Sequence, residues 1–133
     1  MKTKLFFFLA AAVSLLLASA SISAHHGSSV YDGTKVTTMK ATVTDYLFMN
    51  PHTEIQFEVK GPDGKVEKWT AEASSLVTMA RLGWTKSTMK PGDQITVYGN
   101  CAKNGSHTMR LSKVIFPDGK ETIVVRGEDY ADQ

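Results

Sequence analysis

The chain has only one cysteine, Cys101, among its 133 residues. An intramolecular disulfide is therefore excluded, and a hydrophobic core has to stabilise the folded chain. Long apolar runs are scarce as well. After the apolar stretch at 5–17, no segment approaches the length of a membrane-spanning helix. We also find no internal repeat and no low-complexity segment beyond that stretch, which indicates a single small globular domain.

Signatures of catalysis are absent from the sequence. There is no Gly-x-Ser-x-Gly motif, no glycine-rich phosphate-binding loop and no two-cysteine redox motif. A chain of this size with short loops also leaves little room for a deep pocket. We therefore expect that the protein is not an enzyme.

The first 24 residues have the pattern of a secretory signal peptide. Lys2 and Lys4 form a short positive region, the apolar stretch at 5–17 follows, and small residues lead to Ala24. A cut after Ala20, which follows a stricter Ala-x-Ala pattern, is the alternative. The pattern predicts export to the periplasm and a mature chain with no membrane segment.

Once this segment is removed, the chain carries no excess of positive or negative charge. Cleavage after Ala24 leaves 109 residues, which we divide into a β-barrel domain at 25–125 and a disordered polar tail at 126–133. Loss of Lys2 and Lys4 lowers the Lys and Arg count from 15 to 13, which equals the 13 Asp and Glu residues. A net charge of zero argues against a nucleic-acid partner and against electrostatic adhesion to anionic lipid.

Alternation of apolar and polar residues predicts most of the secondary structure. At 54–60, for example, Ile55 and Phe57 face one side while Gln56 and Glu58 face the other. In the fifth of these segments the apolar face changes sides, which predicts a β-bulge there. The strands are expected at 35–47, 54–60, 65–73, 94–101, 108–116 and 121–125.

A short helix is expected between the third and fourth strands. Ser74 and Ser75 are typical of a helix N-cap, Leu76 to Leu82 carry apolar residues at helical spacing, and Gly83 suits the end of the helix. Short loops imply antiparallel neighbours. The order predicts an all-β fold with one short helix, specifically a small five- to six-stranded antiparallel barrel of the oligonucleotide/oligosaccharide-binding (OB) type. A meander sandwich is the alternative.

Several motifs occur together in a fixed order along the chain. They are His25-His26-Gly27-Ser28, Asn50-Pro51-His52, Trp69, Gly83-Trp84 and Lys90-Pro91-Gly92-Asp93. With this set the chain resembles the small exported bacterial proteins of the domain of unknown function 6152 family. The resemblance implies periplasmic export and a small β-barrel, and it marks the paired histidines and the Asn-Pro-His segment as recurrent polar positions. It implies no particular activity.

The most specific chemical feature is the position of His25. Cleavage after Ala24 would give this residue a free α-amine beside its imidazole, and the two together can chelate a metal ion. His52, at the end of a strand, would complete a three-nitrogen set, and His26 could replace it or point to solvent. Such nitrogen-rich sites favour Cu(II). The sequence therefore predicts a periplasmic copper-binding protein that stores, delivers or senses the ion through His25, His26 and His52.

Each of these residues also has a simpler interpretation. Histidines at a chain terminus are commonly just solvated, and His52 could cap a backbone group in a turn. His107 is expected in an exposed loop, and Cys101 is either a soft metal ligand or a small half-buried apolar residue. Of the methionines, only Met49 lies beside a candidate ligand, and the others are expected to fill the core.

A second function belongs to a different class. The barrel face would bind a small ligand, a glycan or a partner protein without a metal, and the polar side of 54–60 suits this. Trp69 and Trp84 could form an aromatic platform, although packing in the core is the simpler role for Trp69 and closure of one barrel end for Trp84. An accessory role beside a periplasmic enzyme is a third possibility.

Overall fold

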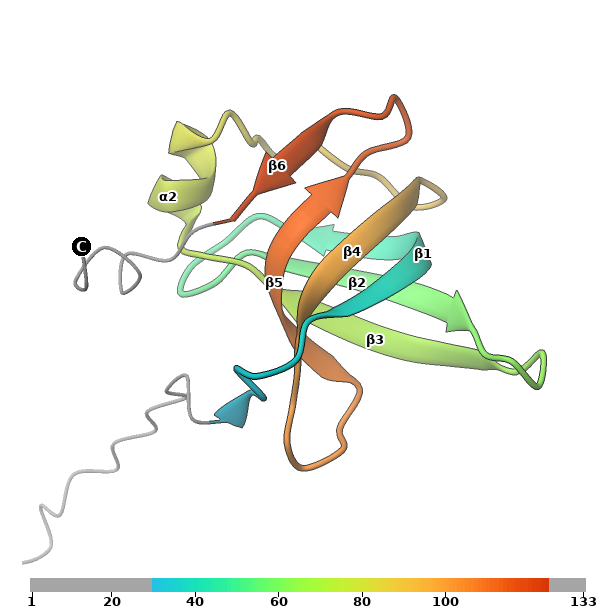
Figure 1. The fold of residues 1–133 in the computed structure, drawn as a ribbon. Helices are drawn as coiled ribbons and strands as arrows, with labels where there is room; N and C mark the ends of the chain where they lie inside the picture. Colours follow the sequence, from blue (N-terminus) through green and yellow to red (C-terminus); the bar gives the residue numbers. More distant parts are fainter. Residues whose placement is uncertain (1–29, 125–133) are drawn as a thin grey trace, which may run out of the picture.

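The computed structural model describes residues 30–124, so the expected signal peptide, His25, His26 and the expected tail lie outside the described residues. Six strands and one short helix follow one another along this part of the chain (Figure 1). They are β1 (Thr37–Leu47), β2 (Glu54–Lys60), β3 (Val66–Glu72), α2 (Leu76–Arg81), β4 (Gln94–Cys101), β5 (Thr108–Ile115) and β6 (Glu121–Ile123).

The strands form a closed barrel with one strand added to it. Their order in the sheet is β3-β2-β1-β4-β5-β6, and β3 also pairs with β5. That last pairing is parallel and joins Thr70, Ala71 and Glu72 to Thr108, Met109 and Arg110. It closes five strands into a barrel, while β6, among the described strands, pairs with β5 alone. The expected fold class is therefore confirmed, and the alternative of a meander sandwich is wrong.

The apolar side of each strand fills the barrel. Ile55 and Phe57 on β2 are almost fully buried, as their alternation predicts, and Ile95 and Val97 on β4 are buried in the same way. Burial of this apolar surface is the main stabilising contribution in a chain with one free cysteine. The buried core consists of Ala41, Val43, Ile55, Phe57, Ala71, Ala73, Met79, Trp84, Met89, Ile95, Val97, Met109, Leu111, Val114 and Val124.

Strand β5 has the bulge that the change of apolar face predicts. Tyr98 pairs with Lys113 and Gly99 pairs with Leu111, so Ser112 is the extra residue. Its hydroxyl donates a hydrogen bond of 3.1 Å to the Tyr98 carbonyl oxygen. Beside the bulge the two strands come very close together, and Gly99 is the residue at this point because it has no Cβ.

A second irregularity was not expected from the sequence. Between β1 and β2, Val43 pairs with Phe57 and Asp45 pairs with Gln56, which leaves Thr44 as an extra residue on β1. A bulge bends its strand and increases the local twist. The bend lets β1 pair with β4 through its first half and with β2 through its second half, as closure of the barrel requires.

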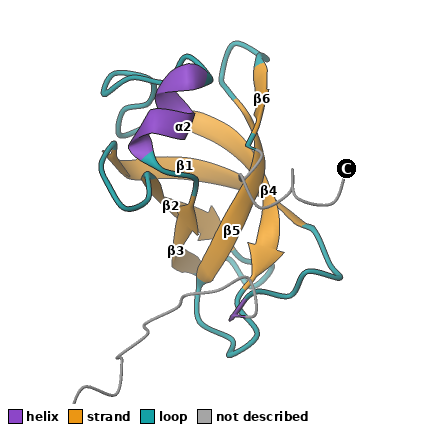
Figure 2. Cartoon of the chain, turned by 90° about the vertical axis from the view of Figure 1, so that its left-hand side faces the viewer, coloured by secondary structure: helices purple, strands orange, loops and turns teal. Residues whose placement is uncertain are grey.

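The helix α2 begins and ends as the sequence predicts. The Ser75 side chain accepts a hydrogen bond of 3.4 Å from the Thr78 N–H, and Gly83 has a φ of +86°, which favours glycine. Figure 2 shows α2 beside one end of the barrel, where Met79 and Trp84 are buried. Among residues 30–124, no helix is long and apolar enough to cross a membrane.

An aromatic cluster occupies this end of the barrel. The ring centroid of Trp84 lies 6.2 Å from that of Tyr46 and 5.7 Å from that of Phe116, and Trp84 donates a hydrogen bond of 3.3 Å from Nε1 to the Thr122 hydroxyl. Burial raises the pKa of Tyr46 to about 12. The position of Trp84 agrees with the expectation that it closes one end of the barrel.

Candidate ligand-binding sites

The loop between β1 and β2 carries His52 and is fixed against α2. The Asn50 side chain accepts a hydrogen bond of 3.2 Å from the Leu76 N–H at the start of the helix. The backbone N–H of Thr53 donates a hydrogen bond of 2.9 Å to the Ser74 carbonyl oxygen, and the Thr53 carbonyl oxygen accepts one of 2.8 Å from the Ala73 N–H. These bonds hold the loop at the α2 end of the barrel.

His52 itself is half-buried on this loop. Its imidazole makes no hydrogen bond, ion pair or ring contact with another residue of the described part of the chain. The backbone group at the start of α2 is bonded by Asn50 instead, so the alternative in which the His52 ring caps the backbone is wrong within residues 30–124. Within residues 30–124, no other residue is bonded to the ring nitrogens of His52.

The first described residues are attached at the other end of the barrel. Tyr31 forms a β-bridge with Ala102, and the Lys103 N–H donates a hydrogen bond of 2.9 Å to the Val30 carbonyl oxygen. In both views the β4–β5 loop, which contains Ala102 and Lys103, lies away from α2 (Figures 1 and 2). The chain thus enters the described structure far from the loop that carries His52.

His107 is exposed at the end of the β4–β5 loop, as expected, but it has a partner. Its ring stacks on the Trp69 indole with the centroids 4.6 Å apart and the planes 8° from parallel. His52 and His107 are not brought together. Residues 30–124 contain no group of three His, Cys, Asp or Glu side chains that could hold a metal ion.

A cavity of about 500 Å³ lies at the end of the barrel opposite α2. We call it the mouth cavity; it is lined by Asp32, Lys35, Thr37, Met39, Trp69, Cys101, Ala102 and Lys103. Cys101 is half-buried there, which agrees with either expectation for this residue. Trp69 is only half-buried because it lies at this opening, although it faces the interior of the barrel as the sequence indicates.

Charged groups surround the entrance of the mouth cavity. The Asp32 carboxylate accepts hydrogen bonds from the Thr34 hydroxyl over 2.6 Å and from the Thr34 N–H over 3.0 Å. These bonds lower the pKa of Asp32, and the charges of Lys103 and Lys35 lower it further. Two cations and one carboxylate therefore share the entrance at neutral pH.

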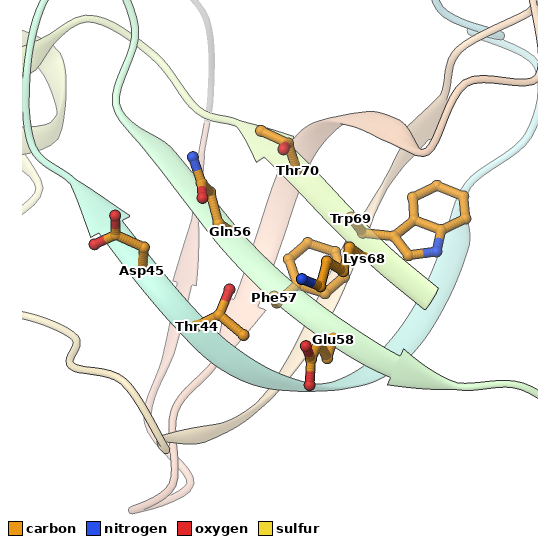
Figure 3. Close-up of a pocket in the computed structure, with 8 residues that line it drawn as sticks. All are labelled: Thr44, Asp45, Gln56, Phe57, Glu58, Lys68, Trp69 and Thr70. Carbon is orange, nitrogen blue, oxygen red and sulfur yellow. The ribbon is translucent and has the colours of Figure 1, made fainter. Parts of the chain in front are cut away.

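A second cavity, of about 350 Å³, lies on the barrel wall formed by β1, β2 and β3 (Figure 3). We call it the sheet-face cavity; it is lined by Thr44, Asp45, Gln56, Phe57, Glu58, Lys68, Trp69 and Thr70. Strand pairing brings its polar residues together, because Gln56 lies opposite Thr70 and Glu58 lies opposite Lys68. Side chains opposite each other in an antiparallel pair share one face of the sheet.

Three polar side chains of this face have no partner within residues 30–124, whereas the Asp45 carboxylate accepts a hydrogen bond of 2.8 Å from the Tyr46 N–H. Gln56, Glu58 and Lys68 make no side-chain hydrogen bond and no ion pair with another residue of 30–124. Gln56 and Glu58 were expected on the polar side of their strand. Lys68 and Thr70 were missed, although they alternate with Trp69 and Ala71 and this alternation could have identified them.

The arrangement of strands and helix is that of an OB-type barrel. Around the barrel the strands follow the order β1-β2-β3-β5-β4, and α2 comes between β3 and β4 along the chain. The chain belongs to a family of unknown function, DUF6152, whose model matches residues 12–110. The family that the motifs indicate is thereby confirmed. No curated protein matches the chain.

Proposed function

We propose that this protein is a periplasmic, non-catalytic module that binds a glycan in the sheet-face cavity. The observation that carries the proposal is the set of polar side chains on β2 and β3 that have no partner within residues 30–124, namely Gln56, Glu58 and Lys68. The face formed by the second and third strands is the one that OB barrels use for oligonucleotides and oligosaccharides.

The mixture of groups on this face favours a glycan over a nucleic acid. Lys68 donates hydrogen bonds, the carboxylates of Asp45 and Glu58 accept them, and the Gln56 amide does both. Sugar hydroxyls also donate and accept, so they match such a surface. A polyanion would meet two carboxylates and one ammonium group, which is an unfavourable balance of charge. The volume of about 350 Å³ is within the range of small-ligand sites.

The test is a titration of the ¹⁵N-labelled mature chain with cellotetraose and chitotetraose, followed by nuclear magnetic resonance. We expect the Gln56 side-chain amide and the Thr70 N–H to move with one of these glycans. Gln56→Ala and Lys68→Ala should weaken binding, while Lys86→Ala, which removes an exposed charge outside this cavity, should not. If neither tetrasaccharide moves these signals, or if all three variants bind equally, the proposal is wrong.

A second candidate is copper binding through a mature N-terminal His25, with His52 or His26 completing the site. The observation in its favour is the half-buried His52 imidazole, which has no partner within residues 30–124 and lies on a fixed loop. Covalent geometry sets a condition: five residues from Val30 span at most about 17 Å. Val30 is attached at the opposite end of the barrel, so this reach decides whether His25 can bind a metal ion together with His52.

Copper binding is tested on the chain purified from the periplasm. Its mass should show His25 at the N-terminus, and Cu(II) should give a paramagnetic spectrum with nitrogen ligands. His52→Ala should change that spectrum and weaken binding, whereas His107→Ala should leave both unchanged. A chain that begins at Ser21, or a spectrum that neither variant alters, excludes the proposed ligand set.

A further inference from the structure

The mouth cavity has an aromatic wall that contacts within the chain hold in place. The Trp69 ring stacks on His107, and its Nε1–H donates a hydrogen bond of 3.1 Å to the Glu67 carboxylate. The Thr70 N–H donates a hydrogen bond of 3.0 Å to the His107 carbonyl oxygen and so holds β3, which carries Trp69, beside the end of the β4–β5 loop, which carries His107. A ligand that packs on Trp69 therefore loses little free energy to the ordering of this side chain.

Part of the remaining lining is apolar, and two lysines and one carboxylate lie at the entrance. Met39 and Cys101 face the same cavity, and both sulfur atoms are polarisable and pack well against an aromatic ring. Lys35 and Lys103 are exposed and form no ion pair within 4.0 Å with another described residue. Asp32 offsets one of these two charges and Thr34 binds one oxygen of its carboxylate, while the Glu67 carboxylate is hydrogen-bonded to Trp69 Nε1.

We propose that the mouth cavity binds a small planar aromatic carboxylate, with its ring against Trp69 and its carboxylate at Lys35 and Lys103. The volume of about 500 Å³ accommodates a ligand of one or two rings. The indole and the sulfur atoms provide the apolar contact, and the two ammonium groups provide charge-assisted hydrogen bonds. This site lies at the barrel end, and its charged residues are not those of the sheet-face cavity.

Three probes separate the contribution of the aromatic ring from that of the carboxylate charge. Benzoate has the ring and the charge, benzamide lacks the charge, and cyclohexanecarboxylate lacks the planar ring. The protein has two indole N–H signals, one from Trp69 and one from the buried Trp84 at the other end, and Trp84→Phe assigns them. We expect benzoate to move the Trp69 signal alone and to bind more tightly than either of the other probes.

Variants then test the charge. Lys103→Gln should weaken benzoate binding about fivefold, as the loss of one exposed charge pair predicts, and added salt should weaken it in the same direction. Lys86→Gln is the matched control and should bind like the unaltered chain. The proposal is overturned if benzoate leaves the Trp69 signal in place, if benzamide binds equally well, or if Lys103→Gln and Lys86→Gln bind alike.

Discussion

Replacement of Gly99 by alanine tests the close approach of β4 and β5. A Cβ at this position would come 2.3 Å from the Arg110 carbonyl oxygen and 3.0 Å from its carbonyl carbon. Both atoms belong to the backbone of a paired strand, so no flexible side chain can move aside. Alanine can be accommodated only if the two strands separate beside the bulge at Ser112.

The size of the effect follows from this geometry. Overpacking costs typically 1–3 kcal/mol, and we expect about 3 kcal/mol because the contact is with backbone. A domain of this length has a free energy of unfolding of roughly 5–14 kcal/mol. Gly99→Ala should therefore remove a fifth or more of that free energy and lower Tm by roughly 10–25 °C.

Urea unfolding followed by circular dichroism measures this free energy. Gly33→Ala is the matched control, because no described residue other than its chain neighbours lies within 4 Å of a Cβ added there, and it should change stability by less than about 0.5 kcal/mol. If Gly99→Ala is as stable as Gly33→Ala, the strands are not as close as described and the reasoning fails.

Three further predictions concern other parts of the barrel. Met109→Ala should reduce the free energy of unfolding by about 2–5 kcal/mol because Met109 is fully buried, and a loss of less than about 1 kcal/mol in urea unfolding would contradict its place in the core. Asn50→Ala should cost about 0.5–1 kcal/mol because the Leu76 N–H loses its acceptor; thermal unfolding measures this, and Asn50→Asp, which keeps an acceptor, should recover most of it. Burial raises the pKa of Tyr46 to about 12, so the folded chain keeps this proton more tightly than the unfolded chain does. Its contribution is complete below about pH 10 and is lost as the pH rises to about 12; because the ring is only half-buried, we expect a loss of about 1 kcal/mol. The difference in unfolding free energy between Tyr46→Phe and the unaltered chain should shrink or reverse over that interval, and a constant difference would refute the assignment.

Local patterns were sufficient for most of the fold. The bounds of β2 and β4 agree with the alternation at 54–60 and 94–101, since period-two burial is a property of the strand itself. The change of apolar face in the fifth strand placed the β5 bulge correctly. The bulge at Thr44 was missed although a similar change of face marks it, because Ala41 and Val43 face the core before it and Tyr46 and Phe48 pack against the core after it.

The candidate sites were harder to predict because they depend on pairing between distant residues. Gln56 and Glu58 were identified as polar strand positions, and alternation could have added Lys68 and Thr70, but the position of these two opposite Glu58 and Gln56 follows only from the register of β2 and β3. The stack of His107 on Trp69 depends on the parallel pairing of β3 with β5, which no local pattern indicates. The N-terminal histidines lie outside the described residues, so the predicted copper site remains a prediction.

Closure of the barrel by only three residue pairs has a consequence for its motions. The contact between β3 and β5 is the shortest between neighbouring barrel strands in the described part of the chain, and regions with few backbone bonds open most readily. Amide hydrogen exchange should therefore be faster at Thr70 than at Phe57 in the middle of β2. Since Trp69 precedes Thr70, a ligand bound in the mouth cavity would stabilise the pairing of β3 with β5 and slow hydrogen exchange at Thr70.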